Sequence, residues 1–334
     1  MIKSAVLTGP TGVLGTALVK TLAKAGVETY VVCHRGSPRN VSILEHPCIH
    51  KVECDMEEID RLPDLIGKSV EAFFHLAWLG TQVNSNRMDM YLQNTNVKQA
   101  LDTVYVAKAL SCKVYVGAGS QAEYGRIDGV IHPDSPTNPI SGYGMAKLCA
   151  GQMTRSLCKE FGIRHIWPRI VSIYGKNDAP KTLVNTLIRA LQAGESPKLT
   201  AGEQMWDYLY ADDAGEALYL MAEKGKDGAV YVLGSGQTRK LKEYMLDIRD
   251  AVNKDLPLKL GAIPYLPDQA MHLEADIANL KQDTGWQPQT DFADGIRALL
   301  MDIHAGGGNC LSRKNKYLSW QNYWLLDENY AACG

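Results

Sequence analysis

Short, almost wholly apolar segments alternate with longer amphipathic segments along the first half of the chain. The apolar segments have the length and composition of strands that are buried on both faces. They occupy residues 3–8, 28–34, 49–54, 71–77, 112–118 and 163–171. The segments between them predict helices at 12–25, about 60–66, about 90–109 and 142–161. Because strands that alternate with helices imply right-handed crossovers, the pattern predicts an α/β fold with a doubly wound parallel sheet.

The pattern becomes mixed after Tyr174. The elements that it predicts are a loop at 174–181, a helix at 182–194 ended by Gly194, a short strand, a helix from about Asp212, a strand at 228–236 and helices at 241–253 and 292–304. We therefore expect a smaller mixed α/β lobe, suited to binding a substrate, beside the parallel sheet.

These patterns divide the chain into three parts. The expected boundaries are 1–175 for the sheet domain with a segment near 205–235 returning to it, 176–204 and 236–303 for the substrate lobe, and 304–334 for a C-terminal tail. The tail carries Trp320, Tyr323 and Trp324, and it is expected to pack either on its own chain or on a second subunit.

Composition excludes several partners. The net charge of -2 shows no basic excess, so we expect no nucleic-acid partner. No apolar run approaches the ~20 residues of a membrane-spanning helix, so no membrane partner is expected. The eight cysteines are scattered without a C-x-x-C pair, and the eight histidines show no ligand spacing. With no signal peptide after Met1, we expect reduced thiols, a cytoplasmic location and no metal site.

The stretch TGPTGVLG, residues 8–15, follows the first strand and opens the first helix. Gly9 would permit a tight turn, Gly12 would let the backbone approach a pyrophosphate, and Gly15 would let the helix pack close to the sheet. The start of the helix offers free N–H groups and a positive dipole end. The loop therefore predicts a dinucleotide-binding Rossmann fold.

The end of the second strand bears on the identity of the dinucleotide. NAD sites usually carry a carboxylate there, about 20 residues beyond the glycines, to bind the ribose 2′-hydroxyl. This chain has VVCHRGSPR, with His34 and Arg35 and no acid in reach. A guanidinium suits a 2′-phosphate, so Arg35 is the first candidate to bind it and Arg39 is a second candidate. The alternative is that Arg35 is a solvated arginine in a loop. NADP(H) is favoured, and NAD(H) is the alternative cofactor.

Tyr143 and Lys147 lie four positions apart in SGYGMAK, so on a helix they share a face. A phenol has an ordinary pKa near ~10, which a neighbouring ammonium lowers. Such a tyrosine can exchange a proton with a substrate oxygen. Because Y-x-x-x-K arises easily by chance, the spacing alone more often indicates a surface pair.

Several further motifs give the chain a resemblance to a known family. Besides TGPTGVLG and YGMAK, they are CDM (54–56), HLAW (75–78), NTNV (94–97), GSQAEYG (119–125), PRIVSIYG (168–175), WDYLYADD (206–213) and TGWQP (284–288). Over roughly residues 3–303 the chain resembles the extended short-chain dehydrogenase/reductase family, and within it the group of nucleotide-sugar epimerases, dehydratases and reductases.

The resemblance implies roles for particular residues. Tyr143 would be the general acid and base, Lys147 would lower its pKa and hold the nicotinamide ribose, and Ser120 would hydrogen-bond the reacting oxygen. Cofactor binding is implied for Gly9, Thr11, Gly12, Val13, Leu14, Gly15, Arg35, Asp55, Met56, Leu76, Ala77, Trp78, Asn96, Tyr143 and Lys147. His75 belongs to the HLAW motif. A homodimer formed through helices like 90–109 and 142–161 is also implied.

The chain departs from the family pattern at the expected substrate site. Family dehydratases carry an acid within two residues after the serine or threonine, but here these positions are Gln121 and Ala122. Glu123 comes one position later, where we expect a loop carboxylate facing water. Dehydration is therefore disfavoured.

Two more departures alter the expected pocket. Ser172 stands where the family often has an asparagine, and Trp206 stands where an arginine is common. Trp206 could stack on a base or pack in the core. With Gln121 and Ala122, these residues are the candidates for contacting the substrate.

We expect an NADPH-dependent reductase of a nucleotide-activated 4-keto-6-deoxy sugar. Hydride would reach C4 while Tyr143 protonates O4 and Ser120 polarises the carbonyl. The alternative is an NAD-dependent nucleotide-sugar 4-epimerase with the same three residues. An alternative of another class is a non-catalytic dinucleotide-sensing protein, since fold does not fix function.

Overall fold

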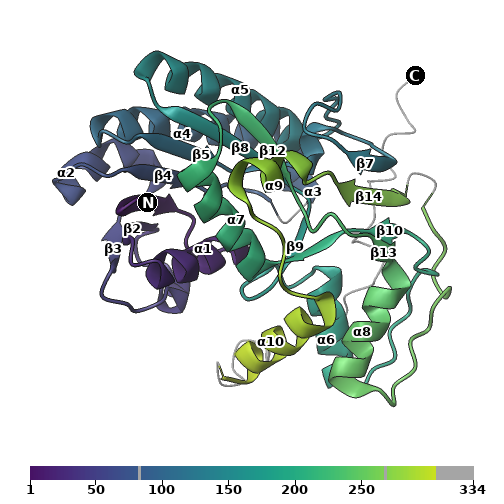
Figure 1. Cartoon of the computed structure of the whole chain (residues 1–334). Coiled ribbons are helices and arrows are strands. Elements are labelled where there is room, and N and C mark those ends of the chain that lie inside the picture. The colour runs from purple at the N-terminus through teal and green to yellow at the C-terminus, as the bar shows by residue number, and fades with distance from the viewer. Residues whose placement is uncertain (82–83, 267–268, 306–334) are drawn as a thin grey trace.

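The computed structural model describes residues 1–81, 84–266 and 269–305 (Figure 1). Its larger sheet has a seven-strand path in the order β12-β8-β5-β4-β1-β2-β3, and every pairing in it is parallel. The strands are β1 (Ser4–Thr8), β2 (Glu28–Cys33), β3 (Ile49–Glu53), β4 (Ala72–His75), β5 (Val114–Gly117), β8 (Arg164–Ile170) and β12 (Ala229–Leu233). A short β6 (Gly119–Ser120) also pairs with β8. The prediction of a doubly wound parallel sheet is confirmed.

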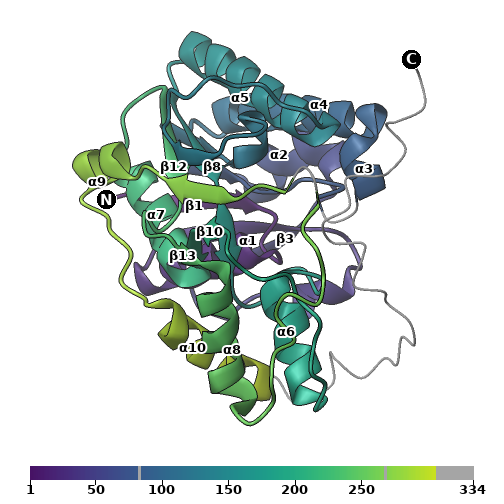
Figure 2. The same ribbon diagram turned by 90° about the vertical axis from the view of Figure 1, so that its right-hand side faces the viewer.

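Helices cover both faces of this sheet. One face carries α1 (Val13–Lys24) and α7 (Ala211–Lys224), and the other carries α4 (Met90–Ala109) and α5 (Gly142–Phe161). Adjacent strand residues serve opposite cores, because Leu7 packs beneath α1 and α7 while Val6 packs beneath α4. α4 and α5 lie together at the top of both views (Figures 1 and 2). The short α2 (Leu62–Ile66) follows a 3₁₀ helix at Met56–Arg61.

A smaller mixed lobe lies beside the large sheet, and its helices are at the bottom of Figure 2. Its four-stranded sheet has the order β13-β10-β14-β7, with one antiparallel pairing between β10 and β13. The strands are β7 (Gly129–Ile131), β10 (Met205–Trp206), β13 (Arg239–Lys240) and β14 (His272–Ala275), and a separate pair is β9 (Ser172–Tyr174) with β11 (Tyr208–Tyr210). The helices are α6 (Leu183–Gln192), α8 (Leu241–Asn253) and α10 (Phe292–Ala305). The predicted mixed lobe is therefore present.

Aromatic rings fill the core of this lobe. Phe292 of α10 has its ring centroid 4.7 Å from that of Tyr174 and 4.6 Å from that of Tyr244. Tyr208 joins the cluster 5.2 Å from Tyr244. Since these rings come from β9, β11, α8 and α10, their packing holds together segments that are far apart in the sequence.

The sequence pattern missed the shortest elements. These are β7, β9, β13, β14, α3 (Asn84–Met88) and α9 (Ala278–Thr284). Elements of two to seven residues carry too few side chains to show a period, so their structure depends on the neighbours that pair with them. The tail aromatics Trp320, Tyr323 and Trp324 lie outside the described residues. Over the described ranges, the helices are too short or too polar to cross a membrane.

Candidate active site

The candidate site lies at the carboxyl edge of the parallel sheet. The chain order reverses between β1 and β4, which is where ligands bind in doubly wound sheets. The glycine loop leaves β1 at this point. Leu76, Ala77 and Trp78 leave β4 beside it, and Ser120 follows β5.

Backbone crowding explains two of the three glycines in the loop. Gly9 has a φ of +76°, and a Cβ there would lie 2.8 Å from the Ala77 nitrogen. A Cβ on Gly15 would collide with the carbonyl oxygen of Gly9. Gly15 therefore lets α1 pack against the backbone of the loop that directly follows β1.

The third glycine faces open space. A Cβ on Gly12 would meet only the Gly9 oxygen, at 3.8 Å. Gly12 is the N-cap of α1 and no side chain caps this end, so the first N–H groups of the helix have no side-chain partner. Free N–H groups beside open space fit the diphosphate of a dinucleotide.

The expectation that no acid is in reach of Arg35 is wrong. The Arg35 guanidinium donates to Glu58 at 3.1 Å, and its backbone N–H donates to Asp55 Oδ1 at 2.9 Å. Asp55 also hydrogen-bonds the His34 ring, and these contacts, led by the Arg35 N–H, hold the Asp55 pKa below its ordinary value. Both acids come from the segment after the neighbouring strand β3, which a search along the second strand does not reach.

Arg39 lies over the glycine loop. Its Nη2 donates to the carbonyl oxygen of Thr11 at 2.7 Å. The 3₁₀ helix Pro38–Ser42 that carries it is capped by Ser37, and the Asn40 amide donates to the His34 carbonyl at 2.9 Å. Two guanidinium groups therefore flank the end of β2, one turned toward Glu58 and one toward the loop.

Asn96 fixes the segment that follows β4. Its side chain accepts from the Leu79 N–H at 2.8 Å and donates to the Leu79 carbonyl at 3.0 Å. The Trp78 indole donates to Gln93 at 2.9 Å. Asn96 thus shapes the wall beside the glycine loop from within α4, where it is buried.

Ser120, Tyr143 and Lys147 come together as the sequence predicts, and all three are nearly buried, with exposed fractions of 8%, 9% and 3%. Lys147 Nζ donates to the Ala118 carbonyl at 2.6 Å and lies 3.6 Å from the Trp78 ring centroid. Burial lowers the Lys147 pKa to about 7.

Tyr143 sits in an environment that opposes its ionisation. Burial raises its pKa, while the charge of Arg87 and a hydrogen bond with Ser120 lower it. Arg87 on α3 was missed by the sequence analysis, because a single arginine in an irregular stretch carries no motif. Its guanidinium carbon lies 4.2 Å from the Tyr143 ring centroid, nearer than Lys147 Nζ at 5.8 Å.

The expectation that Glu123 faces water is wrong, because its side chain is fully buried. One oxygen accepts from the Ser120 N–H at 2.8 Å and from the Trp167 indole at 3.0 Å. The other accepts from Arg169 Nε at 2.6 Å. A buried carboxylate is tolerated here because it is paired and fully hydrogen-bonded. The S-x-x-E spacing of a capping box was the available sequence signal.

The four expected substrate residues fall into two groups. Gln121 and Ala122 form the 3₁₀ turn after Ser120, and the Ala122 N–H donates to the Ser120 hydroxyl at 3.1 Å. Ser172 and Trp206 instead bond each other in the lobe, since the indole donates to the Ser172 hydroxyl at 3.0 Å. Trp206 is half-buried and packs against two of the hydrophobic cores.

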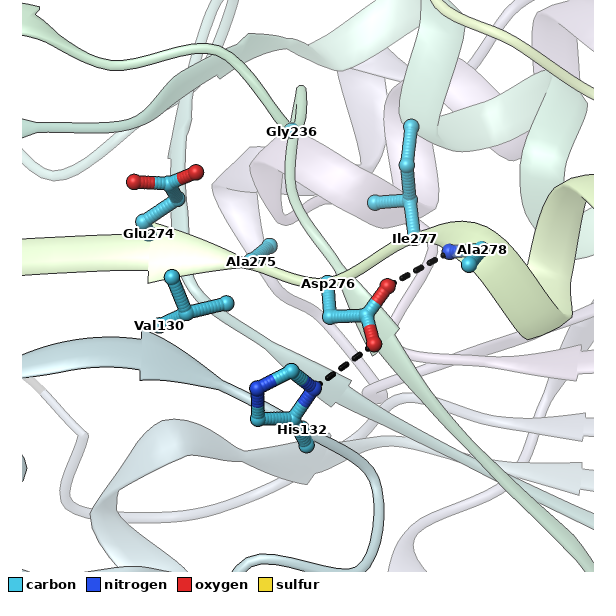
Figure 3. Close-up of a pocket in the computed structure, with 8 residues that line it drawn as sticks. All are labelled: Val130, His132, Gly236, Glu274, Ala275, Asp276, Ile277 and Ala278. Carbon is cyan, nitrogen blue, oxygen red and sulfur yellow. Dashed lines mark hydrogen bonds and ion pairs between the residues drawn. The ribbon is translucent and has the colours of Figure 1, made fainter.

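A separate open pocket of about 400 Å³ lies beside the paired strands β7 and β14 and the segments that follow them (Figure 3). Its lining consists of Val130, His132, Gly236, Glu274, Ala275, Asp276, Ile277 and Ala278. His132 Nδ1 lies 2.7 Å from Asp276, which also accepts from the Ala278 N–H. None of the residues assigned above lines it. Within the described part of the chain, no three His, Cys, Asp or Glu side chains group as metal ligands would.

Comparison with known proteins identifies relatives of the chain. The model of the "NAD dependent epimerase/dehydratase family" matches residues 5–234. A dTDP-glucose 4,6-dehydratase of Shigella flexneri is 27% identical over 58% of the chain, and the match covers 60% of that protein. A dTDP-glucose 4,6-dehydratase of Salmonella typhimurium is 23% identical over 87% of the chain and 90% of that protein.

Solved structures share the whole fold. The UDP-N-acetylglucosamine 4-epimerase of Methanobrevibacter ruminantium, in complex with UDP-N-acetylmuramic acid, superimposes with a TM-score of 0.81. The alignment covers 91% of this chain and 99% of that one at 21% identity. At that identity the likeness establishes the fold.

Proposed function

The chain belongs to the NAD-dependent epimerase/dehydratase family, the extended short-chain dehydrogenase/reductase enzymes that act on nucleotide sugars, and on that premise we propose that it oxidises or reduces C4 of such a sugar. The observation that carries the proposal is the buried cluster of Ser120, Tyr143 and Lys147 at the carboxyl edge of the sheet. Because the family is one of enzymes and this set is complete, the dinucleotide-sensing alternative has no support.

The dinucleotide would lie along the edge from the glycine loop to α5. We propose that the backbone of Gly9, Thr11, Gly12, Val13, Leu14 and Gly15 holds its diphosphate, Asp55 and Met56 its adenine end, Arg35 its ribose, and Leu76, Ala77, Trp78, Asn96, Tyr143 and Lys147 the nicotinamide half. When bound, it would supply or accept the hydride. The open space over Gly12 and the free N–H groups of α1 support this fit.

Tyr143 would move the proton at the sugar oxygen. Its phenol gives a proton to O4 during reduction, and Ser120 donates a hydrogen bond to the same oxygen as negative charge develops. Lys147, held by the Ala118 carbonyl, would bind ribose hydroxyls. Gln121, Ala122, Ser172 and Trp206 are proposed to contact the sugar nucleotide.

Dehydration remains disfavoured for this chain. Gln121 and Ala122 cannot transfer a proton from the sugar, and Glu123 is occupied by Arg169, Trp167 and the Ser120 N–H. Although dehydratases are among its relatives, the acid that elimination of water needs is not available beside Ser120 in this structure.

We propose net reduction of a 4-keto-6-deoxy sugar by NADPH. The support is the pair of guanidinium groups at the end of β2, since Arg35 and Arg39 together offer two charged forks to a 2′-phosphate. Arg39 already reaches the Thr11 carbonyl above the diphosphate loop. A reductase must exchange its cofactor, and NADPH suits net reduction.

One observation favours the NAD-dependent 4-epimerase as the second candidate. Glu58 accepts from the Arg35 guanidinium, so a carboxylate stands where a 2′-phosphate would be repelled and a ribose hydroxyl could be bound. An epimerase would keep NAD bound and act on the same sugar in both directions.

The deciding experiment begins with the purified chain. The protein is denatured, any released nucleotide is identified, and NADPH and NADH affinities are compared by fluorescence titration. A preference for NADPH of at least tenfold, about 1.4 kcal/mol, supports the reductase. Near-stoichiometric released NAD without that preference replaces the reductase by the epimerase. Arg35→Met and Arg39→Met should each weaken NADPH binding, whereas the control Arg61→Met, which removes the other guanidinium that donates to Glu58 Oε2, should not.

The proposed role of the Tyr143 phenol in proton transfer can be tested by substitution. Tyr143→Phe should lower turnover of activated sugars by about 10²–10⁴-fold, the range for loss of a general acid, with little change in cofactor affinity. Undiminished turnover would contradict the role of the phenol.

A homodimer is also proposed. Its support is the exposed apolar face of α4 and α5, where Tyr91 is 89%, Tyr105 55%, Met145 44% and Met153 44% exposed. Sedimentation should give twice the chain mass, and Tyr105→Glu should shift the protein toward the monomer. We also propose domain boundaries at 175, 204, 235 and 303. A cytoplasmic location is proposed as well, on the basis of the scattered cysteines.

A further inference from the structure

Arg87 lies directly against the proposed acid and base. Its guanidinium carbon is 4.2 Å from the centroid of the Tyr143 ring, a cation–π contact. The backbones of the two elements are also close, because a Cβ on Gly142 would lie 3.1 Å from the Arg87 carbonyl oxygen. α3 therefore packs on the first turn of α5 and delivers the half-buried Arg87 side chain to the ring.

Lys147 is less well placed to act on the same ring. Its Nζ donates to the Ala118 carbonyl, lies 3.6 Å from the Trp78 ring centroid and is 5.8 Å from that of Tyr143. Burial brings the Lys147 pKa to about 7, so near neutral pH its charge is partial. A guanidinium stays charged throughout the working range of pH.

The other groups that face Tyr143 do not supply a free positive charge. Ser120 on β6 contributes a neutral hydroxyl. Glu123, from the 3₁₀ turn, is negative and opposes ionisation of the phenol, and Arg169 is bound to it. Trp78 from the segment after β4 contributes a neutral ring that is nearly perpendicular to that of Tyr143, with 6.3 Å between the centroids.

We infer that Arg87 is a positioning residue for Tyr143, whose guanidinium holds the ring and supplies the fixed positive charge that favours the phenolate. Since a phenolate spreads its charge into the ring, a cation on the ring face stabilises it more than the neutral phenol. The catalytic meaning of this contact rests on the proposed role of Tyr143. Arg87 would then be a cation, besides Lys147, that tunes the proton donor.

The test measures the ionisation of Tyr143 directly. The full chain is labelled with [ζ-¹³C]tyrosine, and the Tyr143 resonance is assigned by its loss in Tyr143→Phe. The titration is then compared among the wild type, Arg87→Met and Arg87→Lys. Arg239→Met is the matched control, because it removes an equivalent contact, 4.8 Å over Tyr244, from the lobe.

The inference requires three results. The Tyr143 midpoint should rise by at least about one pH unit in Arg87→Met, which corresponds to about 1.4 kcal/mol. It should return toward the wild-type value in Arg87→Lys and stay unchanged in Arg239→Met. If Arg87→Met does not fold, Arg87→Gln takes its place. Equal midpoints in the wild type and the neutral variants would overturn the inference.

The titration needs neither substrate nor turnover, so it separates the two proposals. If Tyr143→Phe retained full turnover, the proposed function would fail whatever Arg87 does to the phenol. If Tyr143→Phe were inactive and the neutral Arg87 variants titrated normally, the function would stand and the role of Arg87 would not. In an active enzyme, the pH profile of kcat should move with the Tyr143 midpoint in the Arg87 variants.

Discussion

The Glu123 carboxylate accepts a hydrogen bond of 2.6 Å from Arg169, and both side chains are buried. The same carboxylate bonds the backbone N–H of Ser120, three residues earlier. Ser120 is therefore held by a charged pair that joins the turn after β6 to the strand β8. One carboxylate oxygen accepts from the Ser120 N–H and the other accepts from Arg169, so loss of the Glu123 side chain removes both contacts.

Breaking this pair from either side should be costly. Glu123→Ala or Arg169→Met leaves one charge buried without its partner, and each should lower the free energy of unfolding by about 3–5 kcal/mol. The double variant removes both charges and should lose less than the sum of the two. Urea unfolding of the four proteins measures this. Strictly additive losses would show that the two charges are not coupled.

The free energy of unfolding should depend on pH in the neutral to alkaline range because of Lys147. Its folded pKa is about 7, below the ordinary 10.5, because of burial. Between these values the unfolded chain binds a proton that the folded chain does not. The free energy of unfolding should therefore rise with pH from about 7 to 10.5, by up to about 1.4 kcal/mol per unit from this residue.

Substitution isolates that contribution. Lys147→Met should be more stable than the wild type near pH 7, and its stability should rise less steeply between pH 7 and 9. Lys159→Met, at an exposed position of the same helix, is the control and should follow the wild type. Parallel curves for the wild type and Lys147→Met would show that Lys147 does not contribute to the pH dependence.

Two buried histidines should weaken the fold in mild acid. Burial lowers the pKa of His75 to about 3 and that of His165 to about 4. An unfolded histidine binds a proton near pH 6.5, so stability should fall as the pH drops below 6.5 toward these values. Each contributes up to about 1.4 kcal/mol per pH unit.

His165→Phe should remove part of this loss. Its ring stacks between Tyr115 and Trp167, 5.9 Å from each, and a phenylalanine can keep that stack. Urea unfolding at pH 7 and pH 5 should show a smaller difference for His165→Phe than for the wild type. The exposed His304→Gln should behave like the wild type. An unchanged difference in His165→Phe would contradict the assignment.

The glycine loop predicts a contrast between two alanine substitutions. Gly15→Ala places a methyl group against the Gly9 carbonyl and should lower the melting temperature by several degrees, about 1–3 kcal/mol of strain. Gly12→Ala meets open space, so it should keep its melting temperature and weaken dinucleotide binding instead. Calorimetry and fluorescence titration measure the two effects. Tight binding by Gly12→Ala would place the diphosphate elsewhere.

The features that the sequence predicted correctly are those that produce a pattern within a short segment of the chain. The strands of the large sheet are apolar on both faces, and the glycine loop and the Tyr143–Lys147 spacing stand within single short segments. Their positions in the fold follow from connection rules. For this reason the sheet and the grouping of Ser120, Tyr143 and Lys147 could be expected in advance.

What the sequence did not predict depends on partners that are distant along the chain. Glu123 meets Arg169 46 residues later, and Arg35 meets Glu58 23 residues later. Arg87 reaches Tyr143 through the packing of a five-residue helix with no periodic pattern. In each case the charged residue could be read from the sequence. Its environment, however, depends on tertiary contacts that no local spacing predicts.

The contrast between Arg35 and the glycine loop has a consequence for evolution and engineering. Arg35 and its partner Glu58 lie at the surface, so replacing them should cost little stability. Gly9 and Gly15 are held by backbone contacts, which no compensating side chain elsewhere can relieve. Side chains at the end of β2 can therefore be replaced without disturbing the fold, whereas Gly9 and Gly15 cannot.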